Sequence, residues 1–196
     1  MRGFTLTCIF ITLFTFTSGL LYGQNHEYEV RYANHVIGNV SAHCKLNGTA
    51  KNISIQSKVD MRPLTRFNLD ISCEFDNSIM IRSKVIRTGK EGDNKSIITQ
   101  RDGKNYSIIH NGEKSMLNNT EIVHSVSELY FMEPHQISRI YSETLGAFLT
   151  LKTLGNGLYE LNLPEGKKNV YKYEKGVLVQ VEVSQPFGKA FIVRVT

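Results

Sequence analysis

The chain has 196 residues, of which 41% are hydrophobic, and its 23 Lys and Arg against 18 Asp and Glu give a formal net charge of +5. This length suits one domain that buries roughly 70% of its unfolded surface. The basic residues are scattered rather than gathered into blocks, so the composition argues against nucleic acid as a partner. Net positive charge leaves a weak attraction to anionic surfaces open.

Residues 1–23 have the three-part pattern of a secretory signal peptide. One positive charge is followed by a short apolar, threonine-rich run and then by small residues, with cleavage expected after Gly23 and Gly19 as the alternative position. We therefore expect a mature protein of residues 24–196, periplasmic or secreted, with no transmembrane segment after signal removal. A retained anchor helix is the competing interpretation, disfavoured because no Lys or Arg cluster follows the apolar run.

Apolar and polar residues alternate with a period of two through almost the whole mature chain, which is typical of strands with one buried face. The clearest example is residues 67–76, where one face carries Phe67, Leu69, Ile71, Cys73 and Phe75 and the other face is polar or charged. Turns such as Asn47-Gly48 and Asp102-Gly103 separate the strands, because glycine adopts the positive φ angles of tight hairpins.

Two cysteines remain after signal removal, Cys44 and Cys73. Both lie on the apolar side of their predicted strands, where a thiol behaves as a small hydrophobic group. In a meander one strand separates them, which places their Cα atoms about 9–10 Å apart, too far for a disulfide. We expect two buried free thiols, although an exported protein offers an oxidising alternative.

The alternation breaks near residues 126–145. Ser125 and Glu128 have the spacing of a capping box, and apolar residues recur at helical intervals before Pro134, which predicts one short helix. A second short helix is considered around residues 136–141.

Strands resume after Gly146 and continue to the C-terminus, where apolar residues alternate again, ending with Phe191, Val193 and Val195. The pattern predicts about eleven strands in one β-rich domain over residues 24–196. The expected fold is all-β, a single antiparallel and strongly curved sheet or open half-barrel with one helical insert.

Four strings of residues resemble a known family: Val36-Ile37-Gly38, Glu128 to Pro134 (Glu-Leu-Tyr-Phe-Met-Glu-Pro), Ser142 to Gly146 (Ser-Glu-Thr-Leu-Gly) and Val170 to Tyr173 (Val-Tyr-Lys-Tyr). They resemble the secreted Bacteroidota proteins of domain-of-unknown-function family 6134, which has no assigned activity. The strand pattern is also similar to that of periplasmic lipoprotein carriers, whose curved sheet and capping helix enclose an acyl-chain cavity. This second similarity is one of fold alone.

The sequence offers little support for an enzyme. It has no Gly-x-Ser-x-Gly elbow and no histidine pair at metal-binding spacing, so no metal and no cofactor are predicted. Glu133 and Glu143 are the candidates for acid–base chemistry on a glycan. Structural roles are favoured for both, with Glu133 capping backbone amides and Glu143 pairing with Arg139 on a helix.

Three functions remain open. The favoured one is a non-enzymatic carrier for a lipid or other apolar small molecule, and the next is an envelope scaffold that pairs with a protein through a sheet edge. The least favoured is an enzyme. The candidate cavity residues, taken from the insert and its flanks, are Tyr130, Phe131, Glu133, Tyr141, Glu143 and Phe148.

Overall fold

The structure is a computed structural model that describes residues 22–63, 65–89, 94–185 and 188–195. The predicted signal peptide therefore lies outside the described residues except for its last two positions. Within the described residues the fold is all-β, as predicted, and consists of one antiparallel sheet of fourteen strands rather than eleven. No helix of the described chain has the length and apolar character needed to cross a membrane.

The strands follow one another in two series, separated by a long connection. The first series is β1 (Tyr22–Tyr32), β2 (His35–Asn47), β3 (Ala50–Met61), β4 (Thr65–Asp76), β5 (Ile79–Thr88), β6 (Lys95–Asp102), β7 (Asn105–His110) and β8 (Glu113–Leu117). The second series is β9 (Arg139–Ser142), β10 (Ala147–Gly155), β11 (Leu158–Asn162), β12 (Lys168–Glu174), β13 (Val177–Gln185) and β14 (Gly188–Val195).

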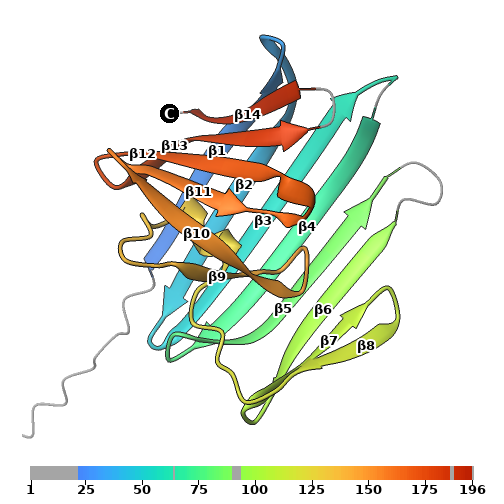
Figure 1. Ribbon diagram of the computed structural model, residues 1–196, viewed down its shortest axis with the longest axis vertical. Coiled ribbons are helices and arrows are strands. Elements are labelled where there is room, and N and C mark those ends of the chain that lie inside the picture. Colours follow the sequence, from blue (N-terminus) through green and yellow to red (C-terminus); the bar gives the residue numbers. More distant parts are fainter. Residues whose placement is uncertain (1–21, 64, 90–93, 186–187, 196) are drawn as a thin grey trace, which may run out of the picture.

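Each series is a meander, and the two meanders join where β1, the first strand of the chain, pairs with β14, the last. The order across the sheet is β8-β7-β6-β5-β4-β3-β2-β1-β14-β13-β12-β11-β10-β9, so the first and last strands of the chain pair near the middle (Figure 1). The edge strands are β8 and β9. The connecting segment, residues 118–138, must therefore run from one edge of the sheet to the other.

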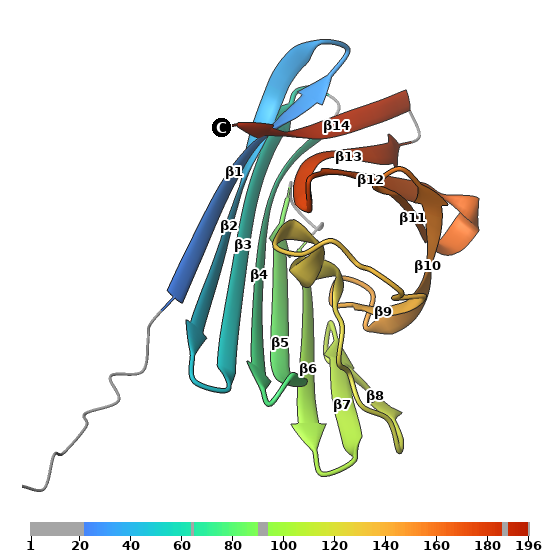
Figure 2. The ribbon, with the colours of Figure 1, turned by 90° about the vertical axis from the view of Figure 1, so that its left-hand side faces the viewer.

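The connecting segment makes this crossing on the concave side of the sheet. Strands β14 to β9 curve away from β1 and return, which gives the sheet a C-shaped outline with the segment inside it (Figure 2). The returning end is tied to the first series by side chains, because the Tyr141 hydroxyl on β9 lies 2.8 Å from the Thr99 hydroxyl on β6. The sheet is thus an open half-barrel, as predicted.

The period-two alternation defines the inner face of the first series correctly. On β3, Ile53, Ile55 and Val59 are buried between exposed neighbours, and on β4 the same holds for Ile71, Cys73 and Phe75. A slip of one residue in either strand would bury polar and charged groups, so the burial pattern fixes the register.

The helical predictions need correction. The insert contains a single 3₁₀ turn, η1 (Val126–Tyr130), and a second one, η2 (Pro164–Gly166), connects β11 to β12. The helix considered around residues 136–141 is wrong, because Gln136 has a φ of 60° and the chain then enters β9. Pairing of β9 with β10 satisfies the backbone groups that a helix would otherwise satisfy internally.

Candidate ligand-binding groove

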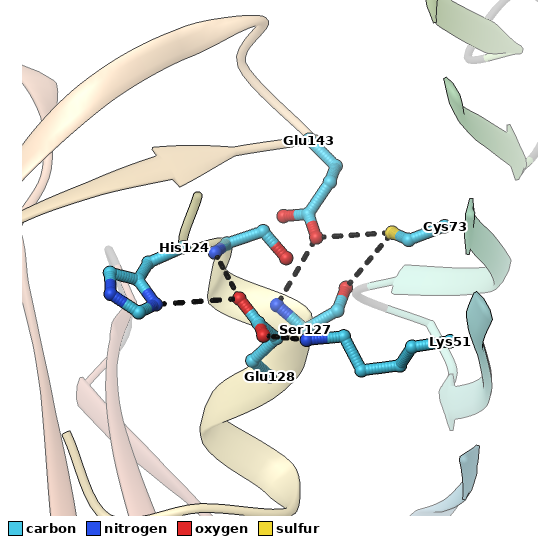
Figure 3. A network of polar contacts seen from close by, with 7 residues as sticks. Lys51, Cys73, His124, Ser127, Glu128 and Glu143 are labelled. Atoms are coloured by element: carbon cyan, nitrogen blue, oxygen red, sulfur yellow. Dashed lines mark hydrogen bonds and ion pairs between the residues drawn. The ribbon is translucent and has the colours of Figure 1, made fainter. Parts of the chain in front are cut away.

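The connecting segment is fixed to the sheet by a buried polar network. The carboxylate of Glu143, 1% exposed, accepts the backbone N–H of Ser127 at 3.2 Å and the Cys73 thiol at 3.2 Å (Figure 3). The Ser127 hydroxyl lies 3.7 Å from the same sulfur. One buried carboxylate therefore holds the start of η1 against β4.

A second carboxylate continues the network. Glu128 accepts the backbone N–H of Ser125 at 2.8 Å, which is the carboxylate half of the predicted capping box. Its other oxygen is paired with the ammonium of Lys51, which also lies 4.3 Å from the centre of the Phe75 ring. His124 Nδ1 is 3.9 Å from Glu128. The network thus joins η1 to both β3 and β4.

Side chains from the second series and from β1 hold the far end of η1. The hydroxyl of Tyr173 donates to the carbonyl of Leu129 at 2.6 Å. His26 Nδ1 lies 2.8 Å from the carbonyl of Tyr130, and the Tyr28 hydroxyl donates to the same carbonyl at 3.4 Å. These bonds satisfy the last carbonyls of the 3₁₀ turn, so the segment is a fitted plug rather than a loose loop.

Burial raises the pKa of the tyrosine and cysteine side chains around this plug. The phenols of Tyr28 and Tyr141 are each raised to about 12 by loss of solvent. The Cys73 thiol is raised well above its ordinary value by burial, reinforced by the neighbouring Glu143 carboxylate. A thiol that stays protonated is a poor nucleophile.

The two predicted acid–base candidates have separate partners. Glu133 accepts the hydroxyl of Tyr159 at 2.8 Å, whereas Glu143 belongs to the network with Ser127 and Cys73. The expected pairing of Glu143 with Arg139 is wrong, because the Arg139 guanidinium lies 3.6 Å from the centre of the Phe148 ring. The reason is that residues 139–142 form a strand instead of a helix.

Two further cavity candidates are packing residues. Tyr141 is fully buried, and its ring meets the Phe148 ring edge to face at 5.5 Å between centroids. Thus Tyr141 and Phe148 join β9 to β10 and do not line the opening described next. Cys44 and Cys73 are free and buried, and they lie on either side of Ile53, the cross-strand partner of both.

A groove of about 340 Å³ remains where the plug meets β1. We call it the mouth groove. It lies between the first half of β1, the end of η1, the β12–β13 turn and the end of β14. Aromatic and aliphatic side chains share the lining with polar ones: Tyr22, Gly23, Gln24, Asn25, His26, Tyr130, Phe131, Gly176, Val177, Leu178 and Arg194. Its volume is in the range of small-molecule sites.

Arg194 is the one cation among the described residues that line the mouth groove. It is the cross-strand partner of Tyr28, and its positive charge acts against the burial that raises the pKa of the Tyr28 hydroxyl. Its Nη1 atom is buried and has no hydrogen-bond partner among the described residues. An unpaired, buried donor is costly, so an acceptor that reached Nη1 would be bound favourably.

The sequence did not indicate Arg194, because the alternating apolar residues of the last strand lie on the outer face of the sheet and not on the inner one. Ala190 and Ile192 share the inner face with Arg194, opposite Val183 and Val181 of β13. Phe191 and Val193 line a shallow groove of about 470 Å³ on the outer face instead. The inner position of Arg194 follows from the pairing of β1 with β14, and no local sequence pattern indicates that pairing.

The outer groove differs from the mouth groove in its electrostatics. It is lined by two cations, Arg31 and Lys189, but each has a carboxylate partner. Arg31 bonds Glu29 at 2.7 Å and Lys189 bonds Glu182 at 2.6 Å. The described part of the chain contains no group of three or more His, Cys, Asp or Glu side chains arranged to hold a metal ion.

The fold and the groove define a half-open antiparallel β-barrel that is plugged by its own connecting segment. The family described as "Domain of unknown function (DUF6134)" matches residues 28–195, and the chain belongs to this family. No curated protein matches.

A solved structure shares the fold, the beta-barrel-like protein of domain of unknown function DUF1849 from Brucella abortus. The two are 7% identical with a TM-score of 0.53, over 91% of this chain and 98% of that one. At this identity the likeness concerns the fold alone.

Proposed function

We propose that this protein is an exported, non-enzymatic binding module that carries an apolar or amphiphilic small molecule in the mouth groove. The observation that carries the proposal is the groove itself, an opening on the concave side between the plug and β1, lined by Tyr130, Phe131 and Leu178. Apolar side chains at an open concavity bind a ligand by removing its apolar surface from water.

The arrangement of the carboxylates supports binding rather than catalysis. Glu133 and Glu143 have different partners, and neither lines the mouth groove. A general acid and base must both reach the reacting bond, which requires them to face one site. Export of the protein to the periplasm or beyond rests on the signal-like residues 1–23 and is part of the same proposal.

A neutral probe tests the proposal. N-phenyl-1-naphthylamine fluoresces in apolar surroundings, and we expect delipidated protein to bind it saturably. Val177 lines the groove and is 41% exposed, so Val177→Glu should fold and weaken binding at least about 10-fold by placing a charge beside the probe. The control is Val36→Glu, at a 58% exposed position remote from the groove, which should bind as the wild type does.

Two results would end the binding proposal: no saturable binding by the wild type, or equal weakening by both valine variants. Mass spectrometry of the native protein purified from its own envelope gives an independent reading, because a bound lipid would appear as a defined mass increment.

A second candidate function is protein pairing through β8, an edge strand of the sheet. Four of its five residues are exposed, and its unpaired backbone groups are a template for another strand. However, Glu113 and Lys114 place charges on this edge, a common means of preventing such pairing. If β8 is an interface, Met116→Pro should abolish capture of a specific envelope partner while leaving the dye binding intact.

A further inference from the structure

We propose that the mouth groove selects amphiphiles with an acidic headgroup, a carboxylate, and that Arg194 binds this headgroup. The inference rests on the proposed function, because it names the ligand class of the same groove. It is carried by the charge of the lining and by the hydrogen-bonding state of one guanidinium.

The side chains that line the groove carry a net positive charge. Among the described residues that form it, none is Asp or Glu, and Arg194 is the one residue with a permanent positive charge. Burial lowers the pKa of His26, so its imidazole is neutral at pH 7 and above. Cleavage at the expected position after Gly23 would add the N-terminal ammonium of Gln24 to the same lining, so the groove favours an anionic headgroup over a neutral or cationic one.

The Arg194 guanidinium has one nitrogen atom without a hydrogen-bond acceptor in the described part of the chain. Arg194 lies directly across the β1–β14 pair from Tyr28, and its Nη1 is buried without a partner among the described residues. Arginine presents its donors as a planar fork that matches the two oxygens of a carboxylate. A carboxylate at this position would supply the missing acceptor.

The remaining lining suits the apolar part of such a ligand. Tyr130 and Phe131 at the end of η1 and Val177 and Leu178 at the start of β13 line the groove together with Arg194. A headgroup bound to Arg194 therefore leaves its hydrocarbon chain beside aromatic and aliphatic side chains. The groove thus places one charged contact next to aromatic and aliphatic side chains, the arrangement that an amphiphile requires.

Displacement of the neutral dye at pH 7.5 measures the selectivity. We expect decanoic acid to displace N-phenyl-1-naphthylamine at concentrations roughly 10-fold lower than 1-decanol, and decylamine to be the weakest of the three. The Arg194→Gln variant should lose the preference for the acid, so that the acid and the alcohol displace the dye at similar concentrations. The control is Arg66→Gln, whose side chain is 65% exposed and does not line the groove, and which should keep the full preference.

The outcomes separate this inference from the proposal beneath it. If the dye does not bind the wild type, the groove is not an apolar site and both fail. If the dye binds but acid and alcohol displace it equally, or if folded Arg194→Gln keeps the preference, the headgroup assignment is wrong and the binding function stands. The comparison of acid with alcohol uses the wild type, so it decides the question even if the variant does not fold.

Discussion

Lys51 is the side chain that joins the plug to the inner face of β3. It faces inward, like Ile53 and Ile55 on the same strand, and it neutralises Glu128, which is 5% exposed. Breaking a buried pair by removing one partner leaves a charge without compensation, which costs more than the pair itself contributes. The stability of the plug should therefore depend strongly on this lysine.

We predict that Lys51→Met lowers the free energy of unfolding by about 3 kcal/mol, measured by urea denaturation. The matched control is Lys58→Met on the outer face of the same strand, which should change stability by less than about 0.5 kcal/mol. Adding Glu128→Gln to Lys51→Met should restore part of the loss, because glutamine still accepts the Ser125 N–H. Equal losses for the two lysine variants would show that the pair has no special role.

At the same scale, the sequence predicted some of these residues and not others. The position of Glu128 followed from the capping-box spacing, and burial of Cys73 followed from strand alternation. The contact of Cys73 with Glu143 joins residues 70 positions apart, so no local spacing could indicate it. Arg194 was hidden for the same reason, because its inner position depends on the pairing of the two chain ends.

Among the structural elements, β2 and β3 show why a glycine is required at position 38. A Cβ atom on Gly38 would lie 2.0 Å from the carbonyl oxygen of Lys58, closer than atoms can approach. Gly38 pairs with Val30 on β1, beside a bulge that leaves Ile37 of β2 without a partner on β1, and it pairs with Val59 on β3. The Val36-Ile37-Gly38 string thus marks a close backbone approach in the sheet.

We predict that Gly38→Ala destabilises the protein by about 3–5 kcal/mol, since the backbone of β3 must move. Gly48→Ala is the control, because that glycine has a φ of 59° in a turn with open space around its Cα. It should cost about 1–2 kcal/mol, the strain of a left-handed conformation alone. Thermal or urea unfolding measures both, and a smaller loss for Gly38→Ala than for Gly48→Ala would refute the steric account.

The types of the elements could be predicted where the apolar residues recur with a clear period, and the predictions failed where they do not. The alternation on β3 and β4 indicated both the strands and their buried faces. The strand β8, with the sequence Glu-Lys-Ser-Met-Leu, has no alternation and was missed. Residues 139–142 lack the side-chain spacing of a stable helix, and they form a strand because they pair with β10.

Considered as a whole, the molecule has an inner face rich in buried phenols, which gives it a defined response to alkaline pH. The phenols of Tyr28 and Tyr141 have pKa values raised to about 12 by burial, and those of Tyr130, Tyr171 and Tyr173 are raised further. In the unfolded chain the same groups ionise near pH 10. Between these values the unfolded state releases protons that the folded state keeps.

We therefore predict that stability from these groups is constant below pH 10 and falls steeply between pH 10 and 12, since unfolding then releases protons. Urea midpoints at pH 8, 9, 10 and 11 measure this, with tyrosinate absorbance at 295 nm recorded in parallel. In the folded protein most of the nine tyrosines should resist ionisation until the chain unfolds. Ionisation of all of them near pH 10 with the fold intact would contradict the burial described here.

The central claim is that the connecting segment plugs the concave face and leaves the mouth groove as the ligand site. Titration of ¹⁵N-labelled protein with decanoic acid, followed by amide chemical shifts, tests it most directly. We predict saturable shifts that centre on His26, Phe131 and Leu178, with those of Ala33 and Lys189 at the outer groove unchanged. Shifts centred on the outer groove, or the absence of saturable shifts, would contradict the claim.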